Sequence, residues 1–111
     1  MKDLIKYDDF EKLEIRAGKV IKASAPEWSE KLVRYEVDFG VDIGEKVLFS
    51  GIRAWYAPDD LVGKMLPVIV NMEPKKMGSE ESQGMTIMAD GEDGPRLILL
   101  DETIMPGTVI R

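Results

Sequence analysis

The sequence predicts an all-β fold in the form of a small barrel, and three observations lead to this. Five or more short runs of residues follow the alternating or continuously apolar patterns of β-strands. Turn-forming residues separate these runs at intervals of about 8–12 residues, which is typical of a barrel or a sandwich. The first long run contains Gly18, and a glycine inside a strand marks a bend that lets a sheet close on itself. This last feature favours a barrel over a sandwich.

The N-terminal part predicts a helix followed by two alternating strands. Residues 7–13 indicate a short helix that Asp8 or Asp9 can cap. The first strand is expected over residues 15–23, with a kink or bulge at Gly18 and with the odd-numbered residues on one side. A loop over residues 24–30 follows. The second strand is a half-buried one over residues 32–39, in which four apolar residues share a face: Val33, Tyr35, Val37 and Phe39.

The remaining elements are shorter and are separated by glycine and proline. Residues 54–61 indicate an irregular or briefly helical segment, because Pro58 suits an early helical position. Strands are expected over residues 46–49, 66–72, 85–89, 96–100 and 109–110. The two strands over residues 85–89 and 96–100 are expected to pair around a turn at residues 90–95. A turn at residues 106–108 precedes the last strand.

Length and composition indicate one soluble domain over residues 1–111. A chain of this length matches the common domain size, and 44% hydrophobic with 32% charged residues is ordinary globular material. There is no run of about 18 apolar residues, and residues 1–9 are too charged for a signal peptide. We therefore expect a cytoplasmic location.

The chain contains no Cys and no His. This excludes disulfides, thiolate nucleophiles, zinc sites with these ligands and Ser-His-Asp triads. The carboxylate-rich stretches at residues 59–60 and 90–93 lack the spacing of a calcium loop and are interpreted as a helix start and a turn. We expect no metal, no cofactor and no catalytic activity, with a small enzyme as the weakest hypothesis.

The net charge of −6 argues against a nucleic-acid binder, because phosphate contacts with cations drive such binding. The charge is uneven, however. Residues 10–34 contain more cations than anions, whereas residues 88–111 contain more anions. A positive face on an acidic protein is therefore compatible with the sequence.

The segment over residues 75–85 combines several groups that recognise nucleic acid. Lys75 and Lys76 enter it, and Ser82, Gln83, Gly84 and Met85 leave it. Such a segment offers charge, a hydroxyl, an amide and a soft apolar side chain. An alternative interpretation is a polar hairpin loop with no ligand, since short motifs have many false positives.

With its surroundings, this segment resembles the hallmark loop of the tRNA-binding OB-fold domain family. Members of this family occur as stand-alone structure-specific tRNA-binding proteins and as the C-terminal or beta-subunit domain of methionyl-tRNA synthetase. The opening strand, Glu14-Ile15-Arg16-Ala17-Gly18-Lys19-Val20, resembles the family pattern acidic-aliphatic-Arg-Val-Gly-Lys-aliphatic. Further matching segments are residues 26–32, 49–52, 56–64, 70–77, 82–85 and 106–108.

The resemblance implies both a fold and a function. The fold is a five-stranded OB-fold Greek-key barrel with short helices and a C-terminal extension, and such barrels bind oligonucleotides on the face of strands 2 and 3. The function is non-catalytic binding of tRNA by shape and backbone, either alone or as an auxiliary to methionyl-tRNA synthetase. The resemblance also implies a homodimer, because family members of this size are similar to homodimeric proteins. Related small OB-fold proteins resemble chaperones, so a protein-binding module is the alternative.

The expected tRNA-binding residues are cations for phosphates and three residues of the loop. They are Lys31, Arg34, Arg53, Lys64, Lys75, Lys76, Ser82, Gln83 and Met85. Met85 can pack on a base or belong to the core, and Trp28 can stack on a base or cap the barrel. The chain departs from the family at Gly78 and Ser79, where Arg-Gly is usual, at Ala25, where His is usual, and through the negative charges of Glu80 and Glu81.

Overall fold

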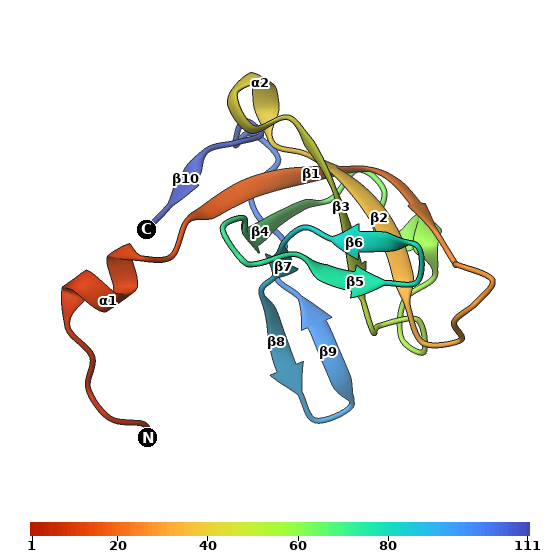
Figure 1. Cartoon of the computed structure of the whole chain (residues 1–111), viewed down its shortest axis with the longest axis horizontal. Helices are drawn as coiled ribbons and strands as arrows, with labels where there is room; N and C mark the ends of the chain where they lie inside the picture. Colours follow the sequence, from red (N-terminus) through yellow and green to blue (C-terminus); the bar gives the residue numbers. More distant parts are fainter.

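A computed structural model describes all residues from Met1 to Arg111 and contains a nearly closed five-stranded barrel. The strands are β1 (Ile15–Ser24), β2 (Val33–Asp38), β3 (Glu45–Ser50), β4 (Met65–Ile69) and β7 (Met85–Thr86). Their order in the sheet is β3-β2-β1-β4-β7, and β10 (Val109–Ile110) pairs with β1 (Figure 1). The predicted all-β barrel is confirmed.

The long strand β1 is the central strand of the sheet, because it pairs with β2 along one half and with β4 along the other. The predicted bulge is misplaced: the register shifts between Val20 and Lys22, not at Gly18. Val20 before the shift and Ala23 after it both face the core, so the predicted odd-numbered face does not continue along the strand. Gly18 has another role, since a Cβ there would lie 2.4 Å from Val37 Cγ1 and 2.6 Å from the Phe39 ring.

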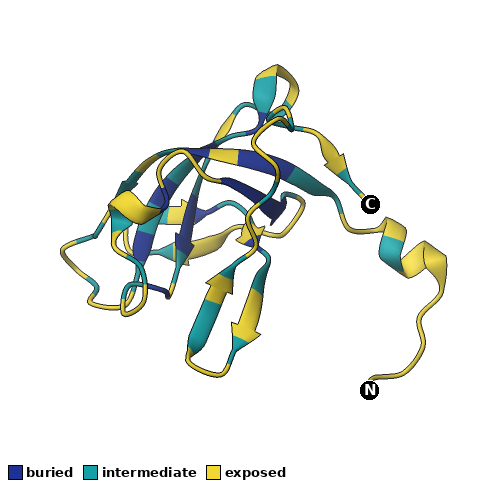
Figure 2. Ribbon diagram, turned by 180° about the vertical axis from the view of Figure 1, so that it is seen from behind, coloured by how far each residue is buried: buried dark blue, intermediate teal, exposed yellow.

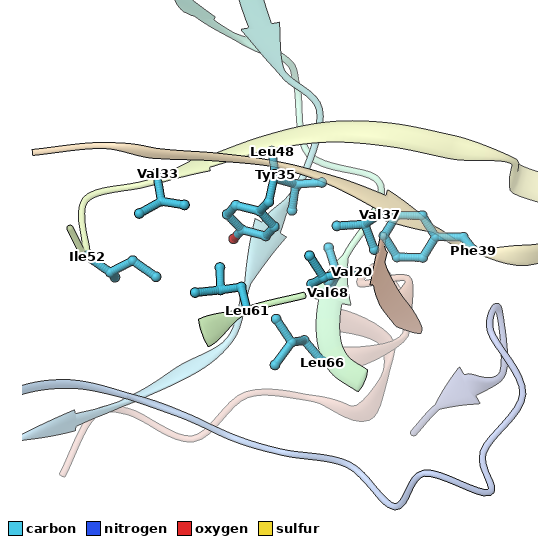
Figure 3. Packing of buried hydrophobic residues seen from close by; sticks show 10 residues of the cluster. All are labelled: Val20, Val33, Tyr35, Val37, Phe39, Leu48, Ile52, Leu61, Leu66 and Val68. Atoms are coloured by element: carbon cyan, nitrogen blue, oxygen red, sulfur yellow. The ribbon is translucent and has the colours of Figure 1, made fainter. Parts of the chain in front are cut away.

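The core fills the barrel interior and follows the alternation of β2. Val33, Tyr35 and Val37 point inward from this strand, and the residues between them are only partly buried. Ten buried residues form the cluster in Figure 3: Val20, Val33, Tyr35, Val37, Phe39, Leu48, Ile52, Leu61, Leu66 and Val68. The apolar face predicted for the second strand is therefore confirmed.

Three short helical segments lie outside the barrel sheet. The N-terminal helix α1 (Tyr7–Glu11) is shorter than predicted and its N-cap is Lys6, although Asp9 accepts the Lys6 backbone N–H. It stands away from the barrel on an exposed arm (Figures 1 and 2). The others are α2 (Gly40–Ile43) and the 3₁₀ turn η1 (Pro58–Asp60), which begins at the proline as expected. No helix has the length and apolar character needed to cross a membrane.

Two hairpins project from the barrel, and the sequence pattern anticipated only one of them. The segment predicted as a loop is a hairpin of β5 (Lys75–Met77) and β6 (Glu80–Ser82). The second hairpin pairs β8 (Met88–Gly91) with β9 (Gly94–Leu97). The strand expected over residues 85–89 is thus split, because β7 pairs with β4 in the barrel before the chain leaves it.

Candidate nucleic-acid interface

A groove of about 760 Å³ opens between the barrel and the β5–β6 hairpin. Four of the seven methionines of the chain line it: Met72, Met77, Met85 and Met88. Phe49 and Ile52 add apolar surface from the barrel side, whereas Lys75 brings a positive charge and Glu73 a negative one. Methionine is flexible and polarisable, so such a wall adapts to planar or irregular apolar ligands.

Ser82 and Gln83 fasten the hairpin to the edge of β3. The buried Ser82 hydroxyl accepts the Phe49 backbone N–H at 3.0 Å. The Gln83 backbone N–H donates to the Val47 carbonyl, and Gln83 Oε1 accepts the Val47 N–H, both at 2.9 Å. These bonds replace strand pairing where the barrel sheet would otherwise be open. The two residues predicted to bind tRNA therefore carry a structural function in the free protein.

A network of three hydroxyl groups lies beneath the groove. The Tyr35 hydroxyl shares hydrogen bonds with Ser50 Oγ at 2.6 Å and with Thr86 Oγ1 at 2.7 Å. Burial raises the pKa of Tyr35 above its ordinary value of 10, although both hydrogen bonds oppose this shift. Ser50 and Thr86 also line the groove, so its floor is polar where its walls are apolar.

The tip of the hairpin rests on Trp28. A Cβ on Gly78 would lie 3.0 Å from two carbon atoms of the indole, and Gly78 has a φ of +62°. The ring of Trp28 is 5.9 Å from that of Phe49, centroid to centroid. Trp28 is still 53% exposed. The glycine that departs from the family pattern is therefore the residue that lets the hairpin tip approach the indole.

Arg34 lies on β2, and each nitrogen of its guanidinium donates to a carboxylate. Its Nε and Nη2 donate to the two carboxylate oxygens of Glu80, each at 2.8 Å, and its Nη1 donates to Glu36 at 2.9 Å. The bonds from Glu80 and Glu36 raise the pKa of Arg34, and the bond from Arg34 lowers the pKa of Glu80. The predicted phosphate ligand is thus paired within the chain.

The other predicted cations occupy different places. Lys75 lines the groove, whereas Lys76 follows it on β5 and therefore points to the opposite face. Lys31 and Lys64 are exposed outside the groove. Arg53 is only partly buried, but its guanidinium donates to the backbone carbonyls of Pro26 and Ser29.

The structure thus brings together part of the predicted set and adds residues that the pattern did not indicate. Lys75, Ser82 and the 54% exposed Met85 share the groove. The sequence interpretation left out Met72, Met77 and Met88 as groove residues. A hairpin prediction would have found Met77, because the alternation Lys75-Lys76-Met77 places it beside Lys75.

Comparison with known families gives one match that covers most of the chain. Residues 15–109 match a family model described as "Putative tRNA binding domain". The chain is 46% identical over 111 residues to the methionine–tRNA ligase of Xanthomonas campestris pv. campestris (strain 8004). The aligned region is 97% of this chain and only 16% of that ligase, so the chain spans a small part of the length of such relatives.

Solved structures give matches over the whole domain. A methionyl-tRNA synthetase-related protein from Pyrococcus horikoshii superposes with a TM-score of 0.91 at 36% identity and covers 99% of this chain and 100% of its own. The CsaA chaperone protein from Picrophilus torridus superposes with a TM-score of 0.89 at 30% identity, covering 97% and 100%. These matches confirm the OB-like barrel fold predicted from the sequence.

Proposed function

This chain belongs to the tRNA-binding domain family, and from that membership we propose that it binds tRNA without catalysing a reaction of its own. It recognises tRNA by shape and backbone, through the groove and the adjacent β2–β3 face. One observation supports this best: the groove combines apolar walls, a hydroxyl floor and a cation in one place. RNA-binding proteins hold unpaired bases on such surfaces and hold phosphates at their cationic edges.

The predicted site residues divide into four groups by where their side chains lie and what they contact in the free protein. Met85 and Lys75 face the groove and contact RNA directly, with Met85 packing on a base and Lys75 beside a phosphate. Lys31, Lys64 and Lys76 are exposed cations that add longer-range attraction. Arg53, Ser82 and Gln83 hold loops in place. Arg34 reaches a phosphate only when its carboxylate partners release it.

The partners follow from the same proposal. The relatives include methionine–tRNA ligases, so this domain acts alone or as an auxiliary of methionyl-tRNA synthetase in the cytoplasm.

It forms a homodimer through the N-terminal arm, where several apolar side chains are exposed: Leu4, Ile5, Tyr7 and Leu13. Val109 at the C-terminal edge is exposed beside the same region. A dimer buries these side chains and doubles the RNA-binding surface.

A protein-binding function is the second candidate. The apolar groove and its methionines suit an unfolded segment as well as a base. The similarity to a chaperone structure at 30% identity points the same way. The two functions differ in their salt dependence, because apolar peptide binding releases no counterions from a phosphate backbone.

The proposal is tested by titrating the protein with bulk tRNA over a range of salt concentrations. Micromolar binding that weakens as salt rises is expected for the wild type. Met85→Ala is expected to lower affinity by about 1–3 kcal/mol through lost base stacking, and Lys75→Gln to reduce the salt slope by about 1. Lys22→Gln is the matched control, since it removes the same charge from an exposed position of β1 that does not line the groove.

Ser82→Ala is a poor test because it also removes the acceptor of the buried Phe49 N–H. Absence of binding by the wild type at low salt would refute the tRNA proposal. Equal effects of Lys75→Gln and Lys22→Gln would place the site elsewhere on the surface. Salt-independent binding of an apolar peptide, with no RNA binding, would favour the protein-binding function.

A further inference from the structure

Arg34 lies on the β2–β3 face, and each of its three guanidinium nitrogens donates one hydrogen bond to a carboxylate within the chain. Glu80 takes two of its nitrogens in a fork, and Glu36 takes the third. Arg34 and Glu36 are neighbours on one strand, whereas Glu80 comes from β6 of the hairpin, 46 residues away. The Glu80 contact therefore depends on how the hairpin lies over the barrel.

The fork between Arg34 and Glu80 has the geometry that a phosphate would use. Arginine binds carboxylates and phosphates through the same pair of parallel N–H donors. The pair is also within reach of a ligand, because the side chains of Arg34 and Glu80 are 25% and 40% exposed. Exposed ion pairs contribute little to stability, so exchanging one anion for another at such a site is energetically accessible.

The position of Glu80 on its strand distinguishes it from the neighbouring Glu81. Alternation along β6 turns Glu80 and Ser82 toward the barrel and turns Glu81 away from it. Glu80 is partly buried and bonded to Arg34, whereas Glu81 is exposed and forms no ion pair. The raised pKa of Arg34 and the lowered pKa of Glu80 are consistent with a contact held in the free protein.

We propose that Glu80 occupies the phosphate position of Arg34 as an intramolecular competitor, so that an RNA phosphate binds the Nε–Nη2 fork of Arg34 only by displacing Glu80. Glu80 thereby limits the affinity of the protein for tRNA and screens out weakly bound polyanions. The proposal rests on the tRNA-binding function and adds a residue that determines its strength. Displacement also frees the hairpin next to its turn, while Ser82 and Gln83 still hold its base.

The experiment compares Glu80→Gln with Glu81→Gln in titrations with bulk tRNA at several salt concentrations. Both variants remove one negative charge from the same strand, so the difference between them isolates the Arg34 contact. Glu80→Gln is expected to bind several-fold more tightly than Glu81→Gln. It is also expected to steepen the plot of log K against log salt by about 1, because one more phosphate is neutralised.

A double variant identifies the residue through which the gain acts. Arg34→Gln combined with Glu80→Gln is expected to abolish the gain, because no guanidinium remains to bind the phosphate. Fluorescence of Trp28, measured in a Trp55→Phe background, reports in each variant whether the hairpin tip is docked on the indole. A gain that survives in the double variant would overturn the proposal, since it would then come from net charge alone.

The wild-type titration separates this inference from the proposed function. If the wild type binds tRNA and the two glutamine variants behave alike, only the role of Glu80 is refuted. If the wild type does not bind but Glu80→Gln does, the role of Glu80 is supported and the wild type is not a tRNA binder. Weaker binding by Glu80→Gln would overturn the proposal and assign Glu80 to orienting Arg34. If none of the proteins binds at low salt, both ideas fail.

Discussion

The barrel and the β5–β6 hairpin are stabilised in different ways. The barrel encloses ten buried residues, and its strands pair along their lengths. In the hairpin only Ser82 is buried, and polar contacts to β2 and β3 together with one glycine–indole contact hold it in place. Hydrophobic burial dominates the first region, whereas the second depends mainly on hydrogen bonds, because its exposed ion pair contributes little to stability.

This difference suits a binding protein. Regions with few buried apolar contacts open at a lower free energy than the core, and ligand-binding segments are commonly drawn from them. The groove lies at the boundary between the two regions: Phe49 and Ile52 come from the rigid side, and Met77 and Lys75 from the hairpin. The hairpin can therefore adjust to a ligand while the barrel keeps its shape.

The largest expected effect separates the two regions by stability. Leu48 is 0% exposed, so Leu48→Ala should lower the free energy of unfolding by about 2–5 kcal/mol. Met77→Ala in the partly exposed hairpin wall should lower it by less than about 1 kcal/mol. Urea unfolding of both variants measures the difference. Similar losses would mean that the hairpin is part of the same packing unit as the barrel.

An intermediate effect is expected at the tip of the hairpin. Gly78→Ala places a Cβ 3.0 Å from the Trp28 indole at a φ of +62°. Gly63→Ala is the matched control, because Gly63 has a φ of +85° with no neighbouring atom within 4 Å. Both variants should lose about 1–2 kcal/mol of unfolding free energy through left-handed backbone strain.

The two glycine variants should differ in the fluorescence of Trp28, measured in a Trp55→Phe background. Only Gly78→Ala is expected to shift the emission, because only there does the new methyl group meet the indole. The same shift in Gly63→Ala would show that general destabilisation moves Trp28, and that the contact with Gly78 has no separate role.

The difference between the barrel and the β5–β6 hairpin also decides how much of each could be predicted from the sequence. The alternation Val33, Tyr35, Val37 predicted β2 and its core face correctly, since burial imposes a period of two on a strand. The bulge was misplaced from the Val20–Lys22 step to Gly18, because close packing on Val37 and Phe39 also selects glycine.

The hairpin and its contacts were not predictable by the same reasoning. Arg34 was correctly placed on an outer face, but its pairing with Glu80 joins residues 46 positions apart and follows no local pattern. Ser82 and Gln83 were singled out by family resemblance, whereas their bonds to β3 depend on how the sheet closes. Local periodicity therefore predicts the barrel, and long-range polar contacts determine the site.

The smallest expected effect concerns pH and is confined to the hairpin. The hydrogen bonds and charge of Arg34 lower the pKa of Glu80 below its ordinary value of 4.5. A carboxylate whose pKa is lower in the folded protein adds stability that is fully present above the unfolded value. This stability is lost as the pH falls through the lower folded value, so hairpin docking should be constant at neutral pH and weaken in acid below about pH 4.5.

The bonds from Thr103 lower the pKa of Asp101 as well, so Asp101 also contributes to unfolding in acid. A signal from the hairpin itself is therefore needed to observe the transition of Glu80. Trp28 fluorescence in the Trp55→Phe background reports the hairpin tip alone. An acid transition in this signal should precede global unfolding in the wild type and be absent in Glu80→Gln, which has no carboxylate to titrate. If the transition persists in that variant, the Arg34–Glu80 pair is not what fixes the hairpin to the barrel, and the competition proposed for Arg34 loses its structural basis.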